Sequence, residues 1–242
     1  MKVRVISGVS VALIMLALVW IGDIVLAISL CGISIIAYEE VAKATQVRGA
    51  GKGPNALEWV TILGIIIYYA LVFFIQEPLY NMIAVVLLVI VLMLIYVFKF
   101  PVYTAEQVMH SYFSFVYTSV MISFVLMTRM LSNEYDTATT NIGFFAVWMV
   151  FISAWATDTC AYFVGVLFGK HKLIPKLSPK KSVEGCLGGI AGASVAGYLY
   201  GLILVNNEII TTDMVIYFML LGMCGSVVAQ IGDWAASAIK RN

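Results

Sequence analysis

Two aspartates and a run of lysines are the residues of this sequence whose types and spacing could do chemistry. Asp158 and Asp233 each lie within a long apolar stretch, and five of the 14 lysine and arginine residues fall between positions 170 and 181. Ionisable groups inside a membrane are costly and usually serve a function. Carboxylates suit a hard cation such as Mg²⁺, and ammonium groups suit a polyanion. Together they are the groups that phosphoryl and nucleotidyl transfer use.

Two plainer interpretations stay open on spacing alone. The aspartates could form buried ion pairs with the lysines, or the lysines could bind anionic lipid headgroups. A polar stripe in the last apolar segment favours a site, because a helix that faces only lipid would not carry it. The stripe follows one helical face and consists of Ser226, Gln230, Asp233, Ser237, Lys240 and Arg241.

The composition predicts an integral membrane protein. The 242 residues are 62% hydrophobic and 11% charged, with a net charge of only +1, whereas soluble domains are about half apolar and a quarter charged. The four cysteines lie in or beside apolar runs without C-x-x-C spacing. We expect them to be free thiols rather than a disulfide or zinc framework.

The apolar runs predict an all-α, polytopic transmembrane fold. Their lengths suit a bilayer, backbone groups in lipid must pair internally, and a β-barrel would need short alternating runs. We expect one transmembrane domain over residues 1–242, with N-terminal helices at about 4–130 and a catalytic half at about 141–242 that holds a cytoplasmic basic loop at 169–184. The eight expected helices span about 4–21, 24–42, 57–75, 79–99, 110–130, 141–168, 185–205 and 213–239.

The distribution of cations predicts that both termini face the cytoplasm. With the N-terminus inside, every lysine and arginine except Arg129 falls on the cytoplasmic side, as the positive-inside rule requires. The basic loop then faces nucleotides and metal ions, in the cell's inner or plasma membrane.

A stripe of small residues begins where the basic loop ends. The residues recur every fourth position and permit close helix packing; they are Gly185, Gly189, Ala193, Gly197 and Gly201. We expect this stripe to hold its helix against the helix that carries Asp158 or Asp233.

Three motifs carry a resemblance to a known family. Residues Asp158–Leu173 read D-T-C-A-Y-F-V-G-V-L-F-G-K-H-K-L, Ser178–Gly185 read S-P-K-K-S-V-E-G, and Gly232–Asn242 read G-D-W-A-A-S-A-I-K-R-N. In this order they resemble the bacterial phosphatidate cytidylyltransferases, or CDP-diacylglycerol synthases. The sequence ends within the third motif, so we expect it to be truncated at the C-terminus and to lack a second acidic metal ligand of the family.

Some positions depart from the family pattern. Cys160 stands where the family commonly has glycine, and Ser182 and Val183 stand where it has threonine and an aromatic residue.

The resemblance implies a nucleotidyltransferase of phospholipid biosynthesis. The reaction joins CTP and phosphatidic acid to give CDP-diacylglycerol and pyrophosphate. Its nucleophile is a phosphate oxygen that is already ionised near neutral pH, so no strong general base is needed. This agrees with the lack of a Ser-His-Asp or Cys-His arrangement. Charge neutralisation and an in-line approach are what the reaction requires.

The resemblance also implies roles for single residues. Asp233 is the first choice for a Mg²⁺ ligand, and Asp158 is a second candidate for the metal or for organising the site. Lys180 and Lys181 would bind the CTP phosphates or the leaving pyrophosphate. Glu184 would orient a lysine.

Further polar residues would bind phosphate or shape the loop. Ser178 and Ser182 would do either, and Pro179 suits the first turn of a helix begun by Ser178. The lipid phosphate would be held by Ser237, Lys240 and Arg241, which lie where headgroups lie. A supporting role and plain solvation stay open for Lys170, His171 and Lys172.

The expected partners are CTP, phosphatidic acid and membrane lipids, with no nucleic acid, and the resemblance implies a homodimer. A small transporter or channel is an alternative, but it predicts an acid-lined path across the membrane, whereas these acids lie toward one side. Another lipid-phosphate transferase, such as a CDP-alcohol phosphotransferase, would need a D-G-x-x-A-R motif that the sequence lacks.

Overall fold

The computed structural model describes residues 13–49, 53–131, 141–175 and 177–241. It divides into two compact units, Met1–Leu131 and Ser132–Asn242, and each unit is described here by itself. The single transmembrane domain expected from the sequence stays a prediction.

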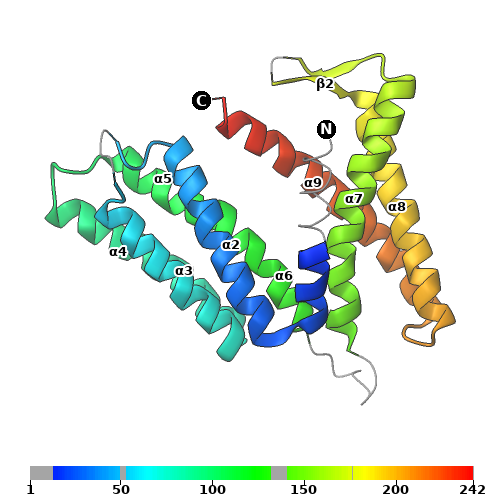
Figure 1. Ribbon diagram of the computed structural model, residues 1–242, viewed down its shortest axis with the longest axis horizontal. Coiled ribbons are helices and arrows are strands. Elements are labelled where there is room, and N and C mark those ends of the chain that lie inside the picture. The colour runs from blue at the N-terminus through cyan, green and yellow to red at the C-terminus, as the bar shows by residue number, and fades with distance from the viewer. Residues whose placement is uncertain (1–12, 50–52, 132–140, 176, 242) are drawn as a thin grey trace. The chain divides into compact units, whose positions relative to one another are not determined.

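Unit 1 is a bundle of long apolar helices (Figure 1). Residues 13–21 are helical, which is the described part of the first predicted segment. The elements that follow are α2 (Asp23–Ala44), α3 (Ala56–Phe74), α4 (Pro78–Phe98), α5 (Ala105–Phe115), the π-helical turn η1 (Val116–Val120) and α6 (Met121–Arg129).

The helix predicted at 110–130 begins earlier than expected. Elements α5, η1 and α6 form one span over Ala105–Arg129, and Thr104 and Gln107 form a capping box at its start. The first turn of this helix is polar, so the apolar run in the sequence underestimates its length. Caps satisfy backbone N–H groups that a helix leaves free, and they mark its start better than hydropathy does.

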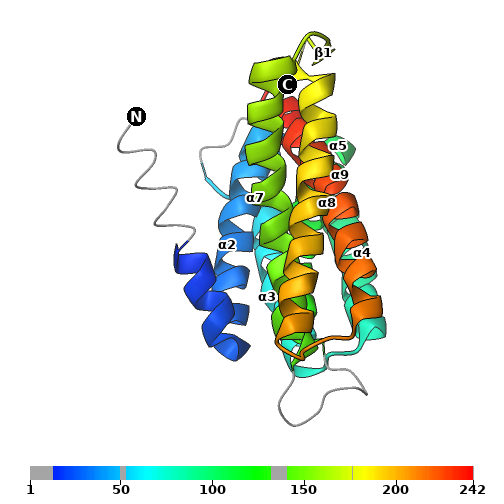
Figure 2. The ribbon, with the colours of Figure 1, turned by 90° about the vertical axis from the view of Figure 1, so that its right-hand side faces the viewer.

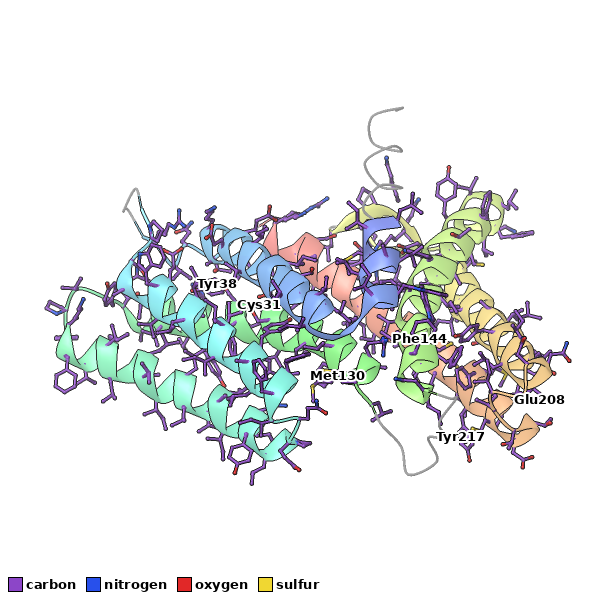
Figure 3. The ribbon with its side chains drawn as sticks, turned by 60° about the horizontal axis from the view of Figure 1, so that its bottom comes forward. Cys31, Tyr38, Met130, Phe144, Glu208 and Tyr217 are labelled. Atoms are coloured by element: carbon purple, nitrogen blue, oxygen red, sulfur yellow. The ribbon has the colours of Figure 1, made fainter. Side chains whose placement is uncertain are left out.

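Buried hydroxyl groups connect the helices of unit 1. The Tyr38 side chain is fully buried inside the bundle (Figure 3), and its hydroxyl oxygen lies 2.8 Å from that of Ser111. The Ser111 oxygen is in turn 2.9 Å from that of Thr61. Such bonds hold transmembrane helices together where lipid removes the hydrophobic driving force.

Unit 2 consists of three packed helices and a short hairpin. Its elements are α7 (Ile142–Phe168), β1 (Lys172–Ile174), β2 (Ser178–Ser182), α8 (Val183–Asn206), η2 (Thr212–Met214) and α9 (Val215–Ile239). Helices α7, α8 and α9 each pack against the other two. Figure 2 shows the hairpin at the end of α7 and α8, which is also the end where α9 finishes.

The all-α polytopic fold is confirmed. Seven helices in the described residues are long and apolar enough to cross a membrane. The basic loop nevertheless contains an antiparallel hairpin, in which Lys172 pairs with Ser182 and Ile174 with Ser178.

The predicted helix start at Ser178 is wrong. Ser178–Ser182 is strand β2, and α8 begins only at Val183. The fixed φ of Pro179 suits a first helical turn and an edge strand alike, so pairing with β1 decides between them. Ser182 is the helix cap, because its Oγ accepts the Gly185 N–H at 3.1 Å.

The small-residue stripe of α8 packs against both neighbouring helices, which confirms its predicted role. A Cβ atom on Gly185 would lie 2.8 Å from the Ala161 carbonyl oxygen of α7, and one on Gly201 would lie 3.3 Å from the Val215 Cα of α9. The backbones therefore approach closely along most of α8.

Replacing Gly222 of α9 by alanine tests this packing. The added methyl group would overlap the Ala193 carbonyl oxygen of α8, and backbone cannot rotate away as a side chain can. We expect Gly222→Ala to destabilise the protein by about 1–3 kcal/mol, measured as a lower thermal unfolding midpoint in detergent.

Gly232→Ala is the matched control in the same helix, because nothing lies within 4 Å of the new Cβ. It should be neutral, or stabilising by up to about 1 kcal/mol. Equal unfolding midpoints for the two variants would contradict the close α8–α9 contact.

Candidate active site

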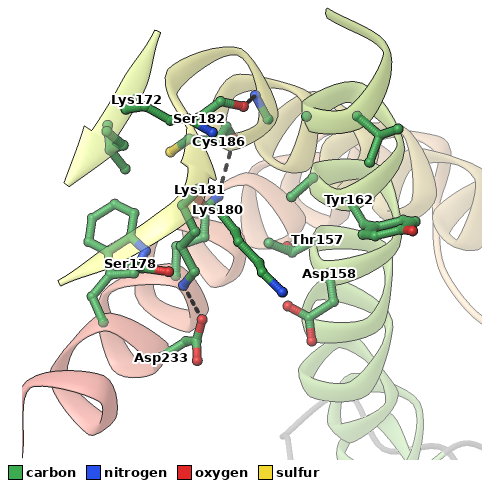
Figure 4. Close-up of a pocket in the computed structure, with 17 residues that line it drawn as sticks. Thr157, Asp158, Tyr162, Lys172, Ser178, Lys180, Lys181, Ser182, Cys186 and Asp233 are labelled. Atoms are coloured by element: carbon green, nitrogen blue, oxygen red, sulfur yellow. Dashed lines mark hydrogen bonds and ion pairs between the residues drawn. The ribbon is translucent and has the colours of Figure 1, made fainter. Parts of the chain in front are cut away.

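A cavity of ≈ 520 Å³ lies at the hairpin end of unit 2. Helix α7 forms one wall, α9 forms another, and the hairpin and the first turn of α8 complete it (Figure 4). Every element of the unit that carries a predicted site residue contributes to this cavity.

Asp158 and Asp233 line the cavity from opposite helices, α7 and α9 (Figure 4). They are close enough for Asp158 to interact electrostatically with both Asp233 and Lys181. Lys181 forms an ion pair with Asp233, and its Nζ lies 5.7 Å from the ring centroid of Trp234. One ammonium group is thus held between a carboxylate and an aromatic face, which also attracts cations.

The hairpin brings three lysines to the same cavity. Lys172 comes from β1, and Lys180 and Lys181 come from β2. The Lys180 side chain is exposed, whereas Lys181 is half-buried. Three ammonium groups and a helix start thus face the same cavity as the two carboxylates.

The N-terminus of α8 also faces the cavity. Ser182 and Gly185, which form its cap, both line the wall. A Cβ atom on Gly165 of α7 would lie 3.3 Å from the Ser182 Oγ, so the cap packs closely against α7 at this glycine. The free N–H groups and the dipole of a helix start favour phosphate groups.

Glu184 ties the start of the hairpin to the first turn of α8. Its carboxylate accepts hydrogen bonds from the backbone N–H groups of Lys170 and His171, each at 3.2 Å. The Nδ1 of His171 lies 2.6 Å from the Glu184 Oε1. The Glu184 carboxylate thus contacts two backbone N–H groups and an imidazole, whereas the sequence predicted that it orients a lysine.

The structure brings six of the ten predicted site residues together at the cavity and leaves Glu184, Ser237, Lys240 and Arg241 out of its lining. The predicted residues that line the cavity are Asp158, Asp233, Lys180, Lys181, Ser178 and Ser182. Ser237 lies on α9 beyond Asp233, and Lys240 and Arg241 follow the end of α9 at Ile239; none of the three lines the cavity. The Ser237 hydroxyl donates to the Asp233 carbonyl oxygen at 2.8 Å.

Sequence reasoning missed several cavity residues. Trp234, Thr157 and Cys186 line the wall, yet aromatic and small residues in apolar runs usually face lipid or other helices. Gln230 was recognised only as a member of the polar stripe. The one signal that could have found Thr157 and Trp234 is that each is the immediate neighbour of a cavity aspartate.

The two carboxylates of the cavity suit a hard cation that takes its remaining ligands from water or substrate. No group of three or more His, Cys, Asp and Glu side chains that could hold a metal occurs among the described residues. Asp158 and Asp233 are two carboxylates on one cavity, and Mg²⁺ is typically held by one or two carboxylates together with water and substrate phosphates.

Fold and site together define a polytopic membrane protein in which one end of the unit 2 helices carries a cavity lined by lysines and aspartates. A model of the cytidylyltransferase family matches residues 2–242, so the chain belongs to that family.

Named relatives share different lengths of the chain. It is similar to the phosphatidate cytidylyltransferase of Haemophilus influenzae, with 37% identity over 123 residues, which are 51% of this chain and 42% of that protein. The enzyme of the same name from Bacillus subtilis is 26% identical over 242 residues, 100% of this chain and 85% of that protein. That of Staphylococcus saprophyticus is 39% identical over 100 residues, 41% of this chain and 36% of that protein. The matched region thus spans less than half the length of the Haemophilus and Staphylococcus relatives.

Glu184→Gln tests the connection between hairpin and helix. The neutral amide loses the charge that strengthens the bonds from Lys170 and His171. Hydrogen bonds to a charged acceptor are stronger than those to a neutral one, so we expect these two backbone N–H groups to exchange hydrogen for deuterium roughly tenfold faster in the variant. Glu208→Gln, in the loop at the other end of α8, is the control and should leave their exchange unchanged. Equal exchange in both variants would show that Glu184 does not hold the hairpin.

Proposed function

We propose that this protein transfers the cytidylyl group of CTP to phosphatidic acid, forming CDP-diacylglycerol and pyrophosphate in phospholipid biosynthesis. The observation that carries the proposal is one cavity, at the end of three membrane-spanning helices, that gathers two carboxylates and three lysines. The names of the similar proteins support the same reaction.

The reaction makes electrostatic demands that this cavity can meet. A phosphate oxygen of phosphatidic acid attacks the α-phosphorus of CTP and forms a new P–O bond. The bond from the α-phosphorus to the oxygen that bridges to the β-phosphate breaks, and pyrophosphate leaves with its electron pair. Two polyanions must approach each other, so fixed positive groups lower the barrier by reducing their repulsion.

The lysines of the hairpin would supply this positive charge. Lys172, Lys180 and Lys181 line the wall around the start of α8, which itself attracts phosphate. Lys181 is paired with Asp233 in the free protein. When a phosphate enters, the ammonium group of Lys181 can leave the Asp233 carboxylate and pair with the phosphate. The charge of Lys181 is then neutralised both with and without substrate.

Asp233 and Asp158 would hold Mg²⁺ between α9 and α7. Bound there, the ion would neutralise charge on the phosphates of CTP and of the transition state. Two carboxylates that face one cavity repel each other unless a cation lies between them, and in the free protein Lys181 is near both. A divalent ion would therefore relieve the same repulsion that Lys181 relieves without it.

The exposed apolar side chains of the cavity suit a lipid substrate. Tyr162 and Val166 line the cavity from α7 and are each 67% exposed. In a bilayer such side chains contact acyl chains, so a phosphatidic acid could place its headgroup in the cavity and leave its chains in lipid. The positive-inside distribution of lysine and arginine favours the cytoplasmic side of the cell membrane for this opening.

A direct test supplies labelled CTP and phosphatidic acid to the purified protein in lipid vesicles. We expect a labelled CDP-lipid and an equal amount of pyrophosphate in the presence of Mg²⁺, and neither product after the ion is removed with a chelator. Failure to form a CDP-lipid, together with ion flux across the vesicles in the absence of CTP, would instead support a transporter.

Variants of the two paired residues test the site. Asp233→Asn removes a charge from the proposed metal site, and Lys181→Ala removes an ammonium group from the proposed phosphate site. Each should lower kcat/KM by about 100-fold or more, as the loss of a preorganised electrostatic contact typically does.

Asp213→Asn is the matched control, because Asp213 lies in η2 of the same unit and is not one of the residues that line the cavity. It should keep wild-type kinetics. Unchanged turnover in Asp233→Asn or Lys181→Ala would remove that residue from the site.

A further inference from the structure

Gln230 is a nearly buried amide on the cavity wall. It lies on α9 about one turn before Asp233, on the side away from the hairpin, and its side chain is only 8% exposed. Its amide nitrogen donates a hydrogen bond to the Cys186 carbonyl oxygen of α8 at 3.2 Å. The same nitrogen donates to the Oγ of Ser226, one turn further along α9, at 3.3 Å.

These two bonds fix which way the amide faces. A backbone carbonyl can only accept a hydrogen bond, so the nitrogen of Gln230, and not its oxygen, must face Cys186. The Oε1 atom has no hydrogen-bond partner within the described part of the chain. It is also not among the fully enclosed unpaired atoms there, so it keeps access to the cavity. The site therefore presents an oriented acceptor to whatever occupies this end of the cavity.

The position of this acceptor relative to the charged groups indicates which part of a nucleotide it meets. By the proposed function, the lysines of the hairpin hold the phosphates at that end of the cavity. Gln230 lies about 4.5 Å deeper along α9 than Asp233, at a rise of about 1.5 Å per residue. A nucleotide whose phosphates lie at the hairpin end would then direct its base toward Gln230.

We infer that Gln230 selects the base of the nucleotide, with its Oε1 accepting a hydrogen bond from the exocyclic amine of cytosine. The inference rests on the proposed function and adds the residue that distinguishes CTP from UTP. Cytosine carries an amino donor where uracil carries a carbonyl acceptor. Uracil would therefore place two acceptors face to face and leave both unpaired in a largely buried site, which should lower kcat/KM for UTP by at least about tenfold relative to CTP.

The test compares CTP and UTP as substrates of the wild-type protein and of Gln230→Met. Methionine has a similar length but offers neither the acceptor nor the amide donor. We expect the wild type to prefer CTP, and Gln230→Met to lower the ratio of the two kcat/KM values by at least about tenfold, the change that an unpaired group of this kind produces. If Gln230 only supported the helix, both substrates would lose the same factor and the ratio would stay unchanged, which would overturn the inference.

Ser226→Ala is the matched control. The substitution removes the Ser226 hydroxyl, which accepts the second hydrogen bond of the Gln230 amide nitrogen, and it leaves the bond to Cys186 intact. Ser226 is fully buried in the same helix. The variant should keep the wild-type preference for CTP. A loss of preference as large as that of Gln230→Met would assign the effect to the packing of α9 and not to the Gln230 oxygen.

An analogue of CTP whose base lacks the exocyclic amine provides a test without any substitution in the protein. The wild type should use this analogue at least about tenfold less efficiently than CTP, because the Gln230 oxygen then stays unpaired. Equal use of both would overturn the inference even if Gln230→Met fails to fold. Absence of any CDP-lipid from CTP would overturn the proposed function as well, whereas product formation with an unchanged CTP-to-UTP ratio in Gln230→Met removes this inference alone.

Discussion

The close contact of α8 with α7 and α9 is the constraint on which the site depends. At Gly185 and Gly189 the backbone of α8 meets α7, and at Gly197 and Gly201 it meets α9. In a bilayer the hydrophobic effect does not drive helices together, so this contact relies on dispersion between closely approaching backbones. The same contact sets the width of the cavity, because Asp158 and Asp233 are carried by the two helices that α8 holds.

The charges of the cavity form a second, coupled constraint. Two carboxylates that face one space are costly unless a cation neutralises them, and Lys181 lies where it can interact with both. The strand that carries Lys181 is short, so its position depends on the bonds that Glu184 and Ser182 make at the start of α8. Helix packing, the cap and the ion pair therefore act on the same few residues. This explains how a small hairpin can hold several lysines in place.

Different interactions hold the helices together within each of the two units. Unit 1 uses hydroxyl groups such as those of Tyr38, Ser111 and Thr61, whereas unit 2 uses glycines. Hydroxyl bonds need side chains between the helices and so keep the backbones apart. Glycine contacts allow the backbones to meet, which is what brings the α8 cap within reach of α7. The chemistry-bearing residues accordingly lie in the unit with the closest helices.

The sequence by itself determined the transmembrane class and nearly all of the helices, and it singled out several residues that line the cavity. Long apolar runs must become helices in lipid, and Asp158, Asp233 and Lys181 are conspicuous because charge within or beside such runs is expensive. Only the tertiary structure decided that Ser178–Ser182 is a strand, that Lys181 pairs with Asp233, and that Gln230 and Trp234 line the cavity. Each of these depends on contacts between residues far apart in the chain. An apolar helical position reads the same in sequence whether it faces lipid, a neighbouring helix or a cavity, and the φ angle of Pro179 suits both a strand and a helix.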